Sequence, residues 1–92
     1  VKLESVIILP DTVCVNKMIS EIKLRSETGV SIIGIERKEK RIVNPDPYEE
    51  IYEGDKILII GQKDQLEVAK KFLNSPETEY KPKNIFPRDR RS

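Results

Sequence analysis

Apolar residues fall into short runs along this chain, and most of the runs have the composition of β-strands. Runs rich in β-branched residues predict strands over 2–9, 30–37, 41–44 and 56–61. Pro10 and Asp11 end the first run, and the charged turn between the second and third predicts a β-hairpin over 30–44. The last run, KILIIG, is apolar on both faces, which predicts a central strand.

Two other segments have helical spacing. Over 17–29 the apolar residues Met18, Ile19 and Ile22 recur at helical intervals, with Asn16 as an expected cap and Gly29 as an expected stop. Over 62–75 an apolar stripe predicts an amphipathic helix; its members are Leu66, Ala69, Phe72 and Leu73. The two prolines of PDP, 45–47, predict an extended crossover before the last strand.

The element order is therefore β-α-β-β-β-α. This order predicts an α+β domain with a small, mainly antiparallel sheet and two helices on one face. We expect the domain to cover 1–75 and the polar segment 76–92 to be a disordered or docking tail. A domain in a chain of 92 residues is marginal alone, so dimerisation or attachment to a larger protein would stabilise it. Because Val1 is not a methionine, we expect the chain to be either processed or excised from a longer one, and we favour excision because the first residues already resemble a strand.

The charge and the cysteine content of the chain exclude several classes of function. The chain carries 17 Lys+Arg and 16 Asp+Glu, and it shows no clustered basic face, so no nucleic-acid partner is expected. With one cysteine and no histidine, it offers no internal disulfide, zinc site or histidine-based triad, as suits a reducing cytosol. Cys14 is interpreted as a packed residue. No run approaches the roughly 20 apolar residues of a membrane span, and no signal peptide is visible.

The stretch EGDKILIIGQ, 53–62, raises the question of a phosphate loop. Gly61 stands between a predicted strand and a helix, where free N–H groups would face an anion. It stands alone, however, and Gly54 lies at the opposite end of the strand. We therefore interpret the two glycines as a turn before the strand and an end after it.

Charged positions in the middle of the chain suggest binding rather than catalysis. The acidic stretch 46–55 is interpreted as a solvated crossover, with a weak cation site as the alternative. Arg25 either complements a helix C-terminus or grips phosphate. Arg37 and the KEKR run are interpreted as a solvated hairpin tip. No catalytic constellation and no metal site emerges, so the chain is not expected to be an enzyme.

The order and spacing of four segments resemble a known family. These segments are DTVCVNKMISEIKLR (11–25), TGVSIIGIER (28–37), IVNPDP (42–47) and YEGDKILIIG (52–61). Together they resemble the RCK C-terminal domain, also called TrkA-C, over residues 3 to 73. In that family the GD-containing block is the last strand with its preceding turn, which agrees with the structural interpretation of the glycines.

The resemblance implies a cytosolic regulatory domain of a potassium channel, a potassium transporter or a cation/proton antiporter. Such domains usually form homodimers on the cytoplasmic side of the membrane transporter, and many bind a ligand that shifts its gate. No resident cofactor is implied, because NAD(H) and ATP bind a separate Rossmann domain. Cyclic di-AMP is the regulatory ligand of several members. Two alternatives stay open: a non-sensing assembly module, and the effector domain of a transcription regulator.

The resemblance also implies a ligand site. By position, its residues are Ile19, Arg25, Ser31, Ile32, Lys40 and Pro45. Arg25 would grip phosphate, Ser31 would donate a hydrogen bond, and the apolar members would pack on adenine. The ligand-binding members of the family tend to have Asn at the place of Ser31, His near Lys40, and a small residue at the place of Glu27.

Overall fold

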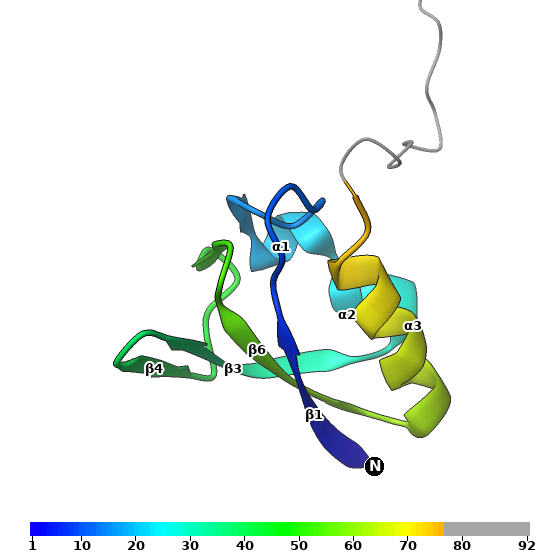
Figure 1. Ribbon diagram of the computed structural model, residues 1–92. Coiled ribbons are helices and arrows are strands. Elements are labelled where there is room, and N and C mark those ends of the chain that lie inside the picture. Colours follow the sequence, from blue (N-terminus) through cyan, green and yellow to red (C-terminus); the bar gives the residue numbers. More distant parts are fainter. Residues whose placement is uncertain (77–92) are drawn as a thin grey trace, which may run out of the picture.

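The computed structural model describes residues 1–76 and contains a four-stranded antiparallel sheet in the order β1-β6-β3-β4 (Figure 1). Its strands are β1 Lys2–Ile7, β6 Lys56–Gly61, β3 Ser31–Arg37 and β4 Lys40–Val43. The four predicted strands and the α+β class are thus confirmed. Strand β6, the KILIIG run, pairs with β1 on one side and β3 on the other, so it is central as predicted.

Three helices and a small second sheet complete the fold of residues 1–76. The helices are α1 Ile19–Ile22, α2 Leu24–Thr28 and α3 Lys63–Leu73. The second sheet pairs β2 Lys17–Met18 with β5 Glu50–Ile51. None of the helices in residues 1–76 has the length and apolar content to cross a membrane. Pro76 bridges to Thr12, and the rest of the predicted tail, 77–92, lies outside the described residues.

The single helix predicted over 17–29 is wrong. Lys23 has the left-handed conformation, with φ 55° and ψ 40°, and it separates α1 from α2. Residues 17–18 pair with β5 and are not part of a helix. Asn16 is not a cap but has a positive φ of 65°, and the carboxylate of Glu21 accepts the Met18 N–H at 2.9 Å. Gly29 does end α2, with φ 82° and its N–H donated to the Arg25 carbonyl.

The crossover between β4 and β6 also differs from the prediction. It contains β5, which pairs with β2 and so gives part of the crossover a regular backbone partner. The sequence between Asn44 and Glu50 contains two prolines and no apolar run, so its pattern gave no strand signal. The pairing therefore depends on residues distant in sequence.

One face of the main sheet forms the core. The side chains of Val6, Ile8, Ile35, Ile57 and Ile59 are buried. Helices α2 and α3 lie against the sheet and against each other (Figure 1). Helix α3 contributes the buried residues Leu66, Ala69 and Leu73, as its stripe predicts. Because each buried isoleucine contributes roughly 1.5–3 kcal/mol, this face is the main source of stability.

The glycines of the last strand have structural roles. Gly54 forms the turn before β6, with φ 86° and its N–H donated to the Ile8 carbonyl. A Cβ on Gly61 would lie 3.0 Å from Cγ2 of Val30, so this position is closely packed. The structural interpretation of the stretch 53–62 is therefore confirmed.

Candidate functional site

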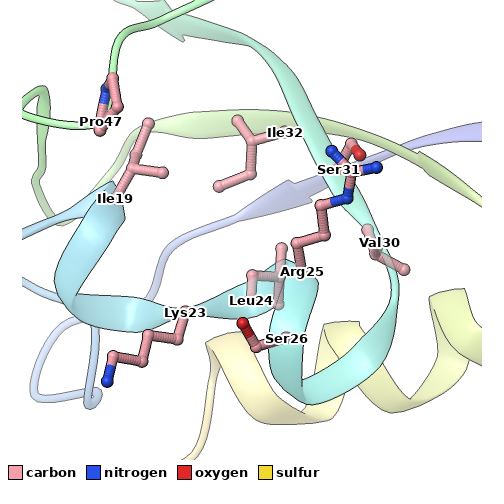
Figure 2. A pocket seen from close by; sticks show the side chains of 9 residues that line it. All are labelled: Ile19, Lys23, Leu24, Arg25, Ser26, Val30, Ser31, Ile32 and Pro47. Carbon is pink, nitrogen blue, oxygen red and sulfur yellow. The ribbon is translucent and has the colours of Figure 1, made fainter.

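A surface pocket of about 330 Å³ lies where α1, α2 and the start of β3 meet the crossover (Figure 2). Its lining combines aliphatic side chains with cations and hydroxyl groups. The lining residues are Ile19, Lys23, Leu24, Arg25, Ser26, Val30, Ser31, Ile32 and Pro47. The volume lies at the low end of the roughly 300–1,000 Å³ that small-molecule sites occupy.

The chain break at Lys23 shapes this pocket. Because Lys23 turns the backbone, α1 and α2 run in different directions and both contribute to the lining. Figure 2 shows the side chain of Arg25 extending from α2 towards the start of β3, the strand end that carries Ser31. Ile19, Ile32 and Pro47 surround the opposite end. The pocket therefore has a cationic, hydroxyl-bearing end and an apolar end.

The crossover wall is fixed to α1 by backbone hydrogen bonds. The N–H of Ser20 donates to the Pro47 carbonyl at 2.9 Å, and the N–H of Ile19 donates to the Glu49 carbonyl at 3.0 Å. These are free N–H groups of the first turn of a helix, which need partners outside the helix. The same bonds hold Pro47 beside Ile19 at the apolar end.

The structure brings together Ile19, Arg25, Ser31 and Ile32, all of which line the pocket. It does not bring Lys40 or Pro45 to it. Lys40 lines a separate hollow at the tip of the β3–β4 hairpin, among Glu36, Lys38, Glu39 and Arg41. The ligand-binding role of the six residues remains a prediction.

Sequence reasoning missed several lining residues, of which Pro47 is the most informative. The PDP segment offers two prolines two positions apart, and only the folded structure shows that Pro47, and not Pro45, lines the pocket. The others missed are Lys23, Leu24, Ser26 and Val30, which surround the helix break that the pattern did not predict. Glu27, whose charge would oppose an anion, is exposed on α2 and does not line the pocket.

A second polar cluster lies at the far end of β3. Arg37 was predicted to be solvated, and this is wrong. Its Nε donates to Oδ1 of Asp55 at 2.8 Å, and its Nη2 donates to Oδ2 at 2.7 Å. Nη2 also donates to the Glu50 carbonyl at 2.9 Å, and the guanidinium carbon lies 4.7 Å from the centre of the Tyr52 ring. Hydrogen bonding to Asp55 raises the pKa of Arg37, whose guanidinium is charged in proteins in any case.

The prediction that the acidic stretch 46–55 is a solvated crossover is also only partly correct, because Asp55 is 1% exposed. A buried carboxylate is costly unless it is paired, and Arg37 supplies the pair. The local sequence contains no sign of this burial, since the two residues are 18 positions apart. Among residues 1–76, no group of three or more Asp, Glu or Cys side chains is arranged to hold a metal ion.

Cys14 is a packed residue, as predicted. It is fully buried, and its Sγ donates to the Leu73 carbonyl at 3.0 Å. Burial raises the pKa of this thiol.

These features define a small α+β domain with a pocket that is apolar at one end and cationic at the other. The chain belongs to the TrkA-C domain family, whose model matches residues 3–74. The resemblance found in the sequence is therefore confirmed.

A curated relative is "Potassium channel protein 1" of Methanocaldococcus jannaschii. It is 34% identical over 62 residues, which is 67% of this chain and 19% of the relative. The chain thus spans about a fifth of the length of that protein.

Solved structures of a second protein are also similar. The RCK_C domain dimer of S. agalactiae BusR in complex with c-di-AMP has 30% sequence identity and a TM-score of 0.73, over 79% of this chain and 96% of that one. BusR in complex with its busAB-promotor DNA has 31% identity and a TM-score of 0.72, over 77% of this chain and 35% of that one.

Proposed function

We propose that this chain is a cytosolic, dimer-forming regulatory domain that senses cyclic di-AMP for a potassium channel, a potassium transporter or a cation/proton antiporter. The observation that carries the proposal is the pocket in which Ile19, Arg25, Ser31 and Ile32 converge. Two similarities support it: the 30% identical RCK_C dimer was solved with c-di-AMP, and the curated relative is a potassium channel protein. The proposal gives the chain no catalytic role.

The pocket suits one half of a symmetric dinucleotide. The Arg25 guanidinium has the planar donor geometry that matches a phosphate, and Ser31 offers a hydroxyl donor at the same end. Ile19, Ile32 and Pro47 offer apolar surface for an adenine face. In this proposal Pro47 takes the role first given to Pro45. Two pockets, one from each protomer of a dimer, would then hold one ligand.

Two alternative functions belong to other classes. A non-sensing assembly module would dimerise and bind no ligand. An effector domain of a transcription regulator is suggested by the BusR complex with promoter DNA. This chain covers 35% of that BusR chain, so most of the DNA-bound protein lies outside the similarity. We propose that the present chain itself makes no contact with nucleic acid.

Calorimetric titration of the purified chain with cyclic di-AMP tests the proposal. We expect saturable binding at one ligand per two chains. Arg25→Ala should weaken this binding about 10- to 100-fold, because it removes a charge-assisted hydrogen-bond donor. The matched control is Arg41→Ala, which removes an arginine of β4 whose side chain is 72% exposed and outside the pocket; it should bind like the wild type.

The other outcomes separate the alternatives. A response to ATP, NADH or a divalent cation, with none to cyclic di-AMP, would keep a sensor and reject this ligand. No response to any of these, from a chain that dimerises, would favour the assembly module. Binding that survives Arg25→Ala unchanged would reject the proposed site.

A further inference from the structure

Arg37 joins its own strand to two other parts of the chain, and we call this set of residues the Arg37 clamp: Arg37, Asp55, Glu50 and Tyr52. Arg37 ends β3, Asp55 precedes β6, and Glu50 begins β5. The fork of two parallel N–H···O bonds to Asp55 fixes the plane of the guanidinium. In that plane, Nη2 also reaches the Glu50 carbonyl at 2.9 Å.

The Asp55 carboxylate, which is the acceptor in the clamp, is also held by several hydrogen bonds. The side chain of Asp55 is almost fully buried and accepts a third hydrogen bond, from the Tyr52 N–H at 2.9 Å. Its backbone carbonyl accepts the Ile8 N–H at 2.9 Å. Asp55 is thus anchored to the sheet and to the crossover at once. A carboxylate so enclosed holds its partner in one geometry.

The clamp is connected to the pocket through the crossover. Residues 47–51 carry Pro47 at one end and the Glu50 carbonyl at the other. Between them, the carbonyls of Pro47 and Glu49 accept the N–H groups of Ser20 and Ile19, at the start of α1. A displacement of this segment would therefore move Pro47 and the first turn of α1 together.

The opposite wall of the pocket belongs to the strand that carries Arg37. Ser31 and Ile32 begin β3, and Arg37 ends it. The crossover is hydrogen-bonded to β3 at both of the crossover's ends. At the start of the crossover, the Asn44 N–H donates to the Ile33 carbonyl at 3.0 Å, and near its end the Glu50 carbonyl accepts from Arg37. The clamp is thus a connection between the two walls, outside the pocket itself.

We propose that Arg37 is a positioning residue for the ligand pocket, which sets the placement of the Ile19–Pro47 wall against the Ser31–Ile32 wall. The claim about ligand affinity rests on the proposed cyclic di-AMP function. The claim about wall placement does not, because it concerns backbone hydrogen bonds of the ligand-free domain. The planar fork is the property that matters, since a single point charge cannot bond Asp55 at both oxygens and reach Glu50 as well.

Arg37→Lys tests this, because it keeps the charge beside Asp55 and removes the fork. The first readout is amide hydrogen exchange without ligand. We expect the Ile19 and Ser20 amides to exchange roughly 10-fold faster, while amides of the β1–β6 ladder keep their wild-type rates. Loss of stability alone would instead accelerate all slowly exchanging amides by one common factor. Arg41→Lys on the exposed face of β4 is the matched control and should change neither group.

The second readout is calorimetric affinity for cyclic di-AMP, which should fall about 10-fold in Arg37→Lys and remain unchanged in Arg41→Lys. Unchanged exchange at Ile19 and Ser20, or a uniform change at all sites, would overturn the positioning role. If the wild-type chain does not bind cyclic di-AMP, the proposed function fails, and the exchange experiment still decides the role of Arg37.

A second variant covers the case in which Arg37→Lys does not fold. The double substitution Arg37→Gln with Asp55→Asn removes both charges, so no buried carboxylate is left unpaired. It also removes the fork. We expect the same selective acceleration at Ile19 and Ser20, and wild-type exchange at these two amides would reject the proposal.

Discussion

Cys14 shows what burial does to a single side chain. Its pKa is raised mainly because burial disfavours the thiolate, from an ordinary value of 9.0. The folded protein therefore keeps this proton at a pH where the unfolded chain releases it. By linkage, the contribution to stability is complete below pH 9 and is lost as the pH rises through the raised pKa of the folded state.

We predict that the free energy of unfolding falls above about pH 9. Cys14 should contribute up to about 1.4 kcal/mol per pH unit to this fall. Urea unfolding of the wild type and of Cys14→Ala between pH 7 and 10 measures it. The variant should be less stable at pH 7 and should lack this part of the slope. Parallel pH profiles for the two proteins would contradict the assignment.

The thiol should also be unreactive in the native protein. A disulfide reagent needs the exposed thiolate, and Cys14 is fully buried with its proton donated to Leu73. Labelling should be fast in denaturant and at least about 100-fold slower in buffer, since it requires opening of the core. Rapid labelling of the native chain would show that the contact between Cys14 and Leu73 opens readily.

At the scale of elements, the break between α1 and α2 depends on one strained residue. A non-glycine residue in the left-handed region costs roughly 1 kcal/mol, and Lys23 has this conformation. Lys23→Gly should therefore leave the free energy of unfolding unchanged or raise it by up to about 1 kcal/mol. Lys23→Val should lower it by more than 1 kcal/mol, because a β-branched residue tolerates this region poorly.

Denaturant titration of the two variants tests this, with Glu27→Gly in α2 as the control. Glycine inside a helix is destabilising by roughly 0.5–1 kcal/mol, so the control should change in the direction opposite to Lys23→Gly. Equal losses at both positions would mean that α1 and α2 behave as one continuous helix.

The elements differ in how far the sequence determines them. Strands β1, β3, β4 and β6 and helix α3 were predicted because their patterns are local. The break at Lys23 was not predicted, because it accompanies the pairing of β2 with β5, and these two strands lie far apart in sequence. The same reason applies to the site. Arg25 and Ser31 were placed in one site by the family resemblance, which also placed Lys40 and Pro45 there, whereas Pro47 and the partner of Arg37 depend on the folded crossover.

For the whole molecule, the proposed dimer makes stability depend on concentration. A domain of this size buries a smaller fraction of its unfolded-chain surface than a larger domain does, so association would add stability. We expect the midpoint of thermal unfolding to rise with protein concentration, and to rise by several degrees more when cyclic di-AMP is present at 100 times its dissociation constant. Scanning calorimetry over a 100-fold concentration range, with sedimentation equilibrium alongside, measures both. A midpoint independent of concentration would argue for a monomer.

The shortness of α1 and α2 also has a consequence for the order of events in folding. The two helices contain 4 and 5 residues, whereas isolated helices shorter than about 12 residues do not persist in water. They can form only against parts of the fold that already exist, which are α3 and β3 for α2, and β2 with the crossover for α1. A refolding chain should therefore assemble β1, β6 and β3 first and complete the pocket in its last step. A ligand that binds the finished pocket would leave the early steps unchanged and slow the first step of unfolding.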